Sequence, residues 1–360
     1  MKSPNNLNFT SNVAGESRIL NVTTHKEFGG GTAVANMLHD TPVFRSSILY
    51  LEKNASLVTA TDQVLYNDVW AVFKCLREVK KNKNIELIHT HGRLAGIFGR
   101  LCKLYKRRVK VVHTFHGINS FGPFKRIIGQ VLESFLTVFT DLVIFNSHHE
   151  RSQYVLPLFC KSVIINNCVN DEKISVIRRD VFDTVGFCGS FAFPKKHLKV
   201  IDLVVAYNKR HRFSPLKLMF CGDGPDRETI VGYAHQVLGE NFVYLGECAD
   251  MRTFYSQIQV YIHFSEYESF CLAVAEAMAN RIPCIVNKGV PIVEHSFTGF
   301  VVPLENIEKQ TKVLEDLIDD SVTRNSVIEN GFDLYQRNFT IKSFRNSHLK
   351  AYQDLGALSD

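Results

Sequence analysis

The sequence predicts an α/β protein with two parallel sheets. Twelve short runs rich in apolar and β-branched residues alternate with helical stretches along the 360 residues. Strands that are apolar on both faces and separated by helices are typical of parallel sheets covered on both sides. A polar, charged segment, Asn170–Asp183, divides the runs six and six, and a chain of this length has room for two domains. We therefore expect two six-stranded Rossmann-like domains.

Each strand is expected where an apolar run falls between polar or glycine-containing segments. The predicted strands are Arg18–Thr24, Ser46–Leu51, Ile85–Thr90, Val109–Phe115, Asp141–Ser147, Ser162–Asn167, Val185–Ser190, Leu216–Cys221, Phe242–Leu245, Val260–Ser265, Ile282–Asn287 and Gly299–Pro303. The expected organisation is a loose polar tail (1–17), a first domain (18–170), a hinge (171–183), a second domain (184–338) and a terminal helix (339–360).

The composition of the chain argues against several classes of protein and of site. No run approaches twenty apolar residues, so no membrane span is expected. Nine cysteines occur without a Cys-x-x-Cys pair, which argues against a zinc or redox motif and fits a reducing cytoplasm. No Gly-x-Ser-x-Gly or Asp-x-Asp motif is present.

Positive charge is concentrated in the first half. Residues 1–180 hold 24 Lys and Arg against 14 Asp and Glu, whereas residues 181–360 hold 18 against 22. A basic half suggests an anionic partner, although a solvated helix end is the alternative. No aromatic stacking platform accompanies the charge, so we expect no nucleic acid. An anionic membrane surface or a phosphorylated lipid acceptor fits better, with the protein placed peripherally on the inner face.

The stretch Phe264–Pro283 carries the strongest functional signal. It places Glu268 in a polar turn after an apolar strand, and Glu276 eight positions later in a helix. If all eight steps were helical, the two would lie roughly 12 Å apart along the axis and about 80° apart around it. This separation suits two hydroxyl clusters, such as the sugar and the ribose of a nucleotide sugar, since carboxylates accept strong hydrogen bonds from diols. The alternative is a solvated helix face with two surface glutamates.

The same stretch resembles the Glu-x7-Glu signature of the family-4 retaining glycosyltransferases of GT-B fold. Its setting matches too, with an apolar strand, Ser-x-x-Glu, Phe-x-Leu, Glu-Ala-Met-Ala and a Pro before the next strand. The resemblance spans roughly residues 18 to 355. It implies that Glu276 holds the ribose diol, that Glu268 contacts sugar hydroxyls, and that the terminal helix returns to the first domain.

A glycine-rich segment follows the first predicted strand. Gly29, Gly30 and Gly31 permit close backbone approach, and the helix that they precede attracts anions to its N-terminus. The segment resembles the glycine-rich first loop of the same family, which implies contact with the donor diphosphate or the acceptor. The alternative is a tight strand-to-helix turn.

Two histidine motifs each end a strand, on the side where open parallel sheets bind ligands. They read His89-Thr-His91-Gly92 and His113-Thr-Phe-His116-Gly117. The resemblance places His116 near the transferred sugar and His91 near the cleft on the acceptor side. His89 and His113 are expected to satisfy loop backbone groups. No carboxylate accompanies the histidines at ligand spacing, so we expect no metal.

The second domain departs from the family pattern at its diphosphate site. Ser190 stands where the family has an Arg, which removes a bidentate phosphate clamp. Lys195 or Lys196 is the retained cation, and the resemblance adds the backbone amides near Phe270, Cys271 and Leu272 to the donor-binding set.

Further departures surround that set. Ser269 and Cys271 replace glycines, and Arg281 replaces the glycine at the helix end. A non-glycine residue at a left-handed cap costs about 1 kcal/mol, and Arg281 could instead point into the cleft. The turn Cys221–Pro225 resembles the family turn that supports the nucleotide pocket, with glycines at positive φ.

These observations predict a metal-independent retaining glycosyltransferase without a cofactor. It would move a hexose from a UDP or GDP sugar to a glycan or lipid-linked acceptor, and the family resemblance implies a role in bacterial surface-polysaccharide or lipopolysaccharide synthesis. Three alternatives stay open: a nucleotide-sugar epimerase on the same fold, a dinucleotide oxidoreductase, and a non-catalytic partner of another transferase. The oxidoreductase is disfavoured by the missing Gly-x-Gly-x-x-Gly fingerprint, while Ser190 and Arg281 favour the non-catalytic partner.

Overall fold

The chain forms two compact units. Unit 1 comprises Met1–Ile165 and Arg345–Asp360, and unit 2 comprises Asn166–Phe344. The sequence predicts the change of domain between residues 170 and 184 and the start of the terminal helix at 339. The computed structural model describes residues 9–11, 18–23, 30–41, 44, 46–50, 79–80, 83–117, 123–170, 174, 182–248 and 250–357, so almost all of the predicted hinge lies outside the described residues.

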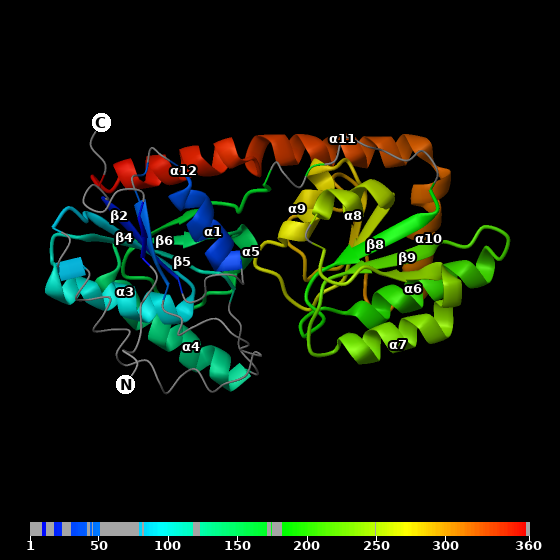
Figure 1. Cartoon of the computed structure of the whole chain (residues 1–360), viewed down its shortest axis with the longest axis horizontal. Helices are drawn as coiled ribbons and strands as arrows, with labels where there is room; N and C mark the ends of the chain where they lie inside the picture. Colours follow the sequence, from blue (N-terminus) through cyan, green and yellow to red (C-terminus); the bar gives the residue numbers. More distant parts are fainter. Residues whose placement is uncertain are drawn as a thin grey trace, which may run out of the picture. The chain divides into compact units, whose positions relative to one another are not determined.

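Unit 1 is built on a sheet with the strand order β1-β3-β2-β4-β5-β6-β7 (Figure 1). The strands are β1 (Phe9–Ser11), β2 (Ile19–Thr23), β3 (Ser46–Tyr50), β4 (Leu87–His91), β5 (Lys110–Thr114), β6 (Leu142–Phe145) and β7 (Lys161–Ile164). The last six are parallel, and β1 pairs antiparallel with β3 at the edge. Residues 9–11 therefore form an edge strand, whereas the sequence predicts part of a loose tail there.

The helices of unit 1 connect and cover these strands. They are α1 (Gly30–His39), α3 (Arg93–Tyr105), α4 (Pro123–Leu136), the 3-10 turn η3 (Thr137–Phe139), α5 (His148–Ser152) and, from Arg345 onward, α12 (Ile341–Gln353). Leu20, Val22, Ile88 and Val111 form part of one core cluster under α3. The Tyr352 ring of α12 packs edge-on against Phe44, with centroids 5.4 Å apart, which ties the end of the chain to this unit.

Unit 2 is built on a six-stranded parallel sheet. Its strands are β8 (Thr184–Cys188), β9 (Lys217–Cys221), β10 (Phe242–Tyr244), β11 (Val260–His263), β12 (Cys284–Val286) and β13 (Phe300–Val301). They lie in the order β10-β9-β8-β11-β12-β13, which is the 3-2-1-4-5-6 arrangement of a Rossmann domain. The predicted α/β class with two parallel sheets is confirmed, and each predicted run overlaps a strand.

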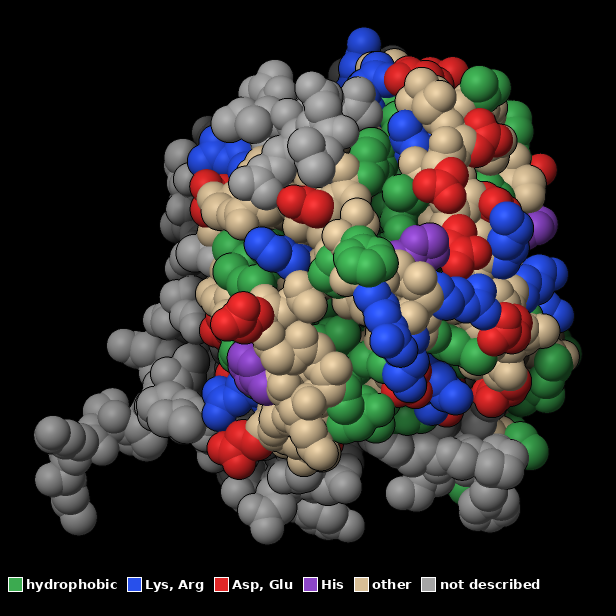
Figure 2. Space-filling model, turned by 90° about the vertical axis from the view of Figure 1, so that its right-hand side faces the viewer, with side chains coloured by type: hydrophobic (Ala, Val, Ile, Leu, Met, Phe, Trp, Pro, Cys, Tyr) green, Lys and Arg blue, Asp and Glu red, His purple; other side chains and the backbone are tan. Residues whose placement is uncertain are grey.

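Helices cover both faces of this second sheet (Figure 1). They are α6 (His197–Arg210), α7 (Arg227–Leu238), η5 (Gly239–Asn241), α8 (Met251–Gln257), α9 (Leu272–Ala279), α10 (Ile307–Asp319) and α11 (Ser321–Asn338). One core cluster includes side chains of α6, α7 and α10, and a second includes those of α8, α9 and α11. On the face seen in Figure 2, acidic and basic side chains are interspersed. Arg210 of α6 pairs with Glu308 and Glu315 of α10.

Candidate functional site

The strand order of unit 2 creates a crevice at one place. β8 and β11 are neighbours whose chain connections leave in opposite directions, and ligands bind beyond the carboxyl ends of such strands. The loop after β8 is bonded to the turn after β11: Lys196 donates its amide to the Phe264 carbonyl at 2.9 Å, and Lys195 forms a β-bridge with Ser265. Two predicted site segments are thus brought together by backbone contacts.

These contacts separate the roles of the two neighbouring lysines. Lys195 turns inward, and its ammonium bonds the Glu268 carboxylate, with both side chains largely buried. Lys196 pairs with Glu266, and that pair is more exposed. Of the two candidates from the sequence, Lys195 is the one that reaches the predicted sugar-side glutamate.

Glu268 is held in its charged form by its neighbours. His263 Nε2 lies 2.9 Å from Glu268 Oε1, on the same oxygen that Lys195 contacts. Burial opposes ionisation, but the His263 hydrogen bond and the Lys195 charge outweigh it and lower the pKa of Glu268 to about 2. The carboxylate is therefore anionic at neutral pH and available to accept hydrogen bonds from hydroxyl groups.

Glu276 lies on the inward side of α9 and is only 3% exposed. Tyr255 of α8 donates its hydroxyl to Glu276 Oε2 at 2.8 Å. The solvated helix face, the alternative reading from the sequence, is therefore excluded for Glu276. Helix α9 begins only at Leu272, so the eight steps from Glu268 are not all helical and the 12 Å estimate does not apply.

A chain of polar contacts lies beneath the two glutamates. The Tyr261 hydroxyl is 3.0 Å from His263 Nδ1 and 3.0 Å from the Cys188 carbonyl oxygen. The Cys188 thiol in turn lies 3.5 Å from both the Tyr255 and Tyr261 hydroxyls. The surroundings of Glu276 and Glu268 are therefore joined through buried residues at the end of β8.

The start of α9 supplies backbone donors beside this cluster. Cys271 precedes the helix in the left-handed region, with φ of 76°, and Phe270 is buried against Phe339. The first amides of α9, beginning at Leu272, have no acceptor inside the helix and favour an anion. Gly222 supports the same edge: its φ is +127°, and a Cβ there would lie 2.0 Å from the Gly189 carbonyl oxygen.

Two departures from the family pattern have different structural consequences. Ser190 is exposed at the end of β8, so no guanidinium stands at that position. Arg281 takes the left-handed conformation with φ of 55°, but its guanidinium pairs with Glu329 and stacks 3.8 Å from the Phe332 ring centroid. The alternative in which Arg281 points into a cleft was wrong, because α11 holds its side chain.

We expect Arg281→Gly to change the free energy of unfolding by less than about 1 kcal/mol. Relief of the left-handed strain is worth about 1 kcal/mol, and the lost ion pair and cation–π contact cost a similar amount. Thermal unfolding of both proteins tests this, with donor kinetics as the control. A large kinetic defect at unchanged stability would contradict the placement of Arg281 away from the site.

One group of potential metal ligands occurs among the residues that the structure describes. The ligand atoms of His263, Glu268 and Cys271 lie within 4.8 Å of one another. Lys195 already places a cation on the Glu268 carboxylate, and burial raises the pKa of the Cys271 thiol well above its usual value. The donor set is therefore poorly suited to a divalent ion, since a thiol must lose its proton to bind one.

The predicted histidines form a second cluster, in unit 1. His116 Nε2 lies 3.4 Å from His91 Nδ1, and His91 Nε2 lies 3.5 Å from Asn21 Oδ1. Asn146 Nδ2 is 3.4 Å from His116 Nδ1. One set of neutral tautomers satisfies all three contacts, with each histidine donating from Nε2.

Burial keeps these histidines uncharged. It lowers the pKa of His116 to about 4. Burial, together with the charges of neighbouring histidines, also lowers the pKa of His91 well below its usual 6.5. His89 bonds the Tyr352 and Thr114 side chains, each at 2.7 Å, so it joins α12 to the sheet. The sequence predicts loop backbone partners for it instead. His113 likewise bonds the Thr90 side chain, at 2.8 Å.

Glu150 fixes the turn that carries His116. Its carboxylate accepts the amides of Gly117 at 2.6 Å and Asn146 at 2.7 Å, while burial raises its pKa to about 8. Gly30 and Gly31 open helix α1 after β2, and Gly29 lies outside the described residues. The predicted site residues thus fall into two groups, one in each unit.

Two protein-family profiles match this chain. A profile described as "Glycosyl transferases group 1" matches residues 177–333, and one described as "Glycosyltransferase Family 4" matches residues 40–173. The chain belongs to glycosyltransferase family 4. The family resemblance drawn from the sequence is confirmed, and the Glu-x7-Glu segment lies within the first of these matches.

Several relatives of this family-4 chain are known. It is 26% identical to an Escherichia coli UDP-Gal:alpha-D-GlcNAc-diphosphoundecaprenol alpha-1,3-galactosyltransferase, over 77% of this chain and 79% of that one. It is 23% identical to the E. coli O-antigen biosynthesis glycosyltransferase WclY, over 79% and 86%. Among solved structures, Anabaena HepE in complex with UDP-glucose superposes with a TM-score of 0.77 at 17% identity, over 93% and 99%. The GT-B fold is thereby confirmed.

Two residues of the candidate site were not predicted from the sequence. Tyr255 and His263, which contact the two glutamates, were not singled out. Tyr261 and His263 alternate on one face of β11, an otherwise apolar strand, and that period of two was the available signal. Tyr255 on α8 offered none, because its contact with Glu276 spans 21 residues and depends on how two helices pack.

Proposed function

We propose that this protein is a retaining hexosyltransferase that uses a UDP or GDP sugar. The observation that carries the proposal is the pairing of Lys195 with Glu268 between β8 and β11 of unit 2. Glu268 precedes the buried Glu276 by eight residues. In the donor complex, Glu276 holds the ribose diol, and Glu268 accepts bonds from the sugar hydroxyls. The Lys195 ammonium then turns to the departing diphosphate, whose developing negative charge is stabilised by this cation and by the amides at the start of α9. His116 and His91 of unit 1 serve the sugar and the acceptor side.

We infer a metal-independent reaction without a cofactor from the same arrangement. Lys195 supplies the positive charge that a divalent ion supplies elsewhere, and it occupies the carboxylate that such an ion would need. The exposed Ser190 is the feature that favours a second candidate, a non-catalytic partner of another transferase. A weak diphosphate clamp at that position would leave nucleotide binding without turnover.

We propose a lipid-linked acceptor for surface-polysaccharide or lipopolysaccharide synthesis, because relatives are named for a diphosphoundecaprenol acceptor and for O-antigen biosynthesis. The enzyme would then work at the inner face of a membrane. None of the helices that the structure describes is long and apolar enough to span one.

The test is a panel of UDP and GDP sugars, read by released nucleotide, with and without diphospholipid-linked sugar acceptors. Acceptor-dependent release supports the transferase; conversion without an acceptor indicates an epimerase, and binding without turnover indicates a non-catalytic partner.

Lys195→Ala should lower kcat/KM for the donor by roughly 10- to 150-fold, the effect of losing one charge-assisted hydrogen bond of about 1.5–3 kcal/mol. Lys196→Ala is the matched control: its partner Glu266 is exposed, so we expect a change of less than about threefold. Steady-state kinetics on the best donor measures both. Equal losses in the two variants would contradict the assignment of Lys195.

A further inference from the structure

Helix α4 of unit 1 exposes five of its apolar side chains. Ile127, Ile128, Val131, Leu132 and Phe135 recur at helical spacing along one face, with 39% to 61% of each side chain exposed. Val138 in the following 3-10 turn is 56% exposed. We call these six residues the α4 face.

The opposite side of α4 is buried and polar. Gln130 donates to the Gln153 carbonyl at 2.7 Å, and Ser134 donates to the Pro157 carbonyl at 2.6 Å. Glu133 is 3% exposed and accepts from the buried Arg100 of α3 at 2.5 Å. The helix is therefore inverted, because a surface helix ordinarily buries its apolar stripe and exposes its polar one.

These buried contacts fix the orientation of the helix. Turning α4 to bury the apolar side chains would take the Glu133 carboxylate away from Arg100 and leave a buried cation without its partner, which is strongly unfavourable. The α4 face is thus held outward by the rest of the unit. A contiguous exposed apolar patch of this kind marks an interaction site.

The charge around the α4 face indicates the kind of partner. Residues 93–138, which include α3 and α4, hold nine Lys and Arg and a single acidic residue, Glu133. Arg100 pairs with Glu133 near the end of α4, and Lys103 pairs with Asp141 just before β6, so the second half of α3 lies beside these segments. Leu104 and Tyr105 in that turn are also exposed, and Lys106, Arg107 and Arg108 follow directly.

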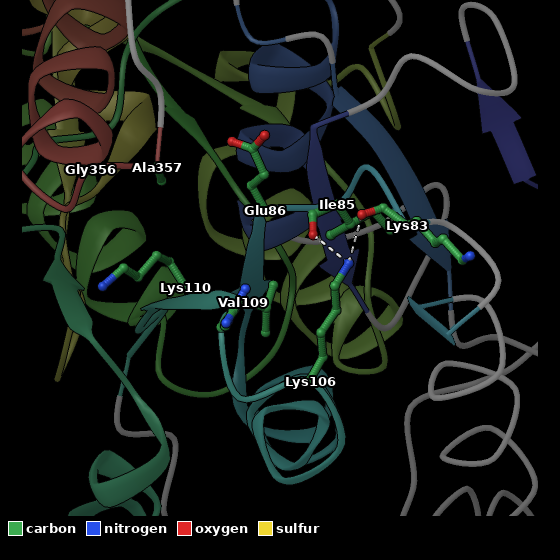
Figure 3. Close-up of a pocket in the computed structure, with 9 residues that line it drawn as sticks. Lys83, Ile85, Glu86, Lys106, Val109, Lys110, Gly356 and Ala357 are labelled. Carbon is green, nitrogen blue, oxygen red and sulfur yellow. Dashed lines mark hydrogen bonds between the residues drawn. The ribbon is translucent and has the colours of Figure 1, made fainter.

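The basic side chains described at the amino ends of β4 and β5 do not converge on one small anion. Lys83, Lys106, Arg108 and Lys110 line a surface pocket of about 350 Å³ at the amino ends of β4 and β5. Lys106 is turned to the carbonyls of Ile85 and Lys83, at 2.7 and 3.2 Å, while Lys83 and Lys110 point to opposite sides (Figure 3). Diverging cations suit an extended anionic surface better than a single phosphate group.

We propose that the α4 face docks this protein on an anionic lipid bilayer. Its apolar side chains enter the boundary between headgroups and acyl chains, as those of an interfacial helix do, and the exposed Arg107 and Arg108 after α3 contact acidic headgroups. The inference rests on the proposed lipid-linked acceptor, because docking brings unit 1 to the membrane in which such an acceptor lies.

The test compares vesicle binding by the full chain and two variants. The wild type should sediment with vesicles containing phosphatidylglycerol, less with pure phosphatidylcholine, and less at high salt. Ile128→Ser combined with Phe135→Ser should lower the partition coefficient by roughly tenfold or more. Phe213→Ser, which removes a fully exposed phenylalanine of unit 2, is the matched control and should bind as the wild type does.

Separate readouts keep this proposal apart from the proposed function. UDP titration should give the same affinity for all three proteins, since the changed residues lie outside the donor site. Vesicle binding that survives the double substitution would overturn the proposal. Lipid-independent self-association of the wild type, lost in the double variant, would also overturn it by identifying the partner as a second copy. Normal docking with no nucleotide-sugar turnover would refute the proposed function alone.

Discussion

Glu276→Ala should lower kcat/KM for the sugar donor by roughly 30- to 1000-fold, a loss of about 2–4 kcal/mol of transition-state stabilisation. The reason is that a buried carboxylate can accept hydrogen bonds from both ribose hydroxyls, each worth about 1.5–3 kcal/mol. Glu276 already accepts the Tyr255 hydroxyl with one oxygen, so its side chain is positioned before the donor arrives. The measurement is initial-rate release of nucleotide over a range of donor concentrations.

Two further variants identify the cause of the loss. Tyr255→Phe keeps the carboxylate and removes its hydroxyl partner, so we expect a smaller decrease, about tenfold or less. Glu276→Gln keeps the size of the side chain and the Tyr255 contact but removes the charge, so it should lie between the other two. A folded Glu276→Ala protein with unchanged donor kinetics would contradict the assignment of Glu276 to the ribose.

Acidification should destabilise unit 1 well before its surface carboxyl groups titrate. Burial and neighbouring charges lower the pKa of His89, His91, His113 and His116 below the usual 6.5. Between pH 6.5 and about 4, the unfolded chain therefore binds protons that the folded unit does not, so the free energy of unfolding falls as pH falls.

Glu150 acts in the opposite direction, because its pKa is raised to about 8 and the folded form holds a proton that the unfolded form lacks between pH 4.5 and 8. The decrease in the free energy of unfolding caused by the four histidines exceeds the increase caused by Glu150. The expected net loss is roughly 3–5 kcal/mol between pH 7 and pH 5.

Hydrogen exchange of the β4 and β5 amides measures this effect, because it reports on unit 1 alone. Protection should decrease steeply below pH 6.5 after correction for the intrinsic exchange rate. His116→Asn removes one titrating group and should reduce the pH slope by about one proton, or 1.4 kcal/mol per pH unit. Protection that is independent of pH from 7 to 5 would show that the histidine cluster takes up protons without opening.

The fold was predictable because it depends on local patterns. Apolar runs bounded by polar turns identified twelve strands, since strands buried on both faces need apolar residues throughout. The strand Phe9–Ser11 was missed because an edge strand needs only backbone pairing, and its sequence carries no apolar pattern.

The candidate site was predictable only where a motif carried it. Glu268 and Glu276 follow from the twenty-residue setting, but the choice of Lys195 over Lys196 depends on the bridge between Lys195 and Ser265, two segments far apart in the sequence. The inverted helix α4 shows the same limit. Its apolar stripe is regular, yet the buried Arg100–Glu133 pair decides which side faces inward.

The central claim is that the carboxyl edge of the unit 2 sheet binds a nucleoside diphosphate through Lys195 and Glu276. Calorimetric titration of the protein with UDP and GDP tests it most directly. We expect one nucleotide to bind the wild type with a stoichiometry of one, and to bind Lys195→Ala at least tenfold more weakly, a change of about 1.4 kcal/mol. Heat of binding from neither nucleotide, or equal affinity in the wild type and in Lys195→Ala, would contradict the claim.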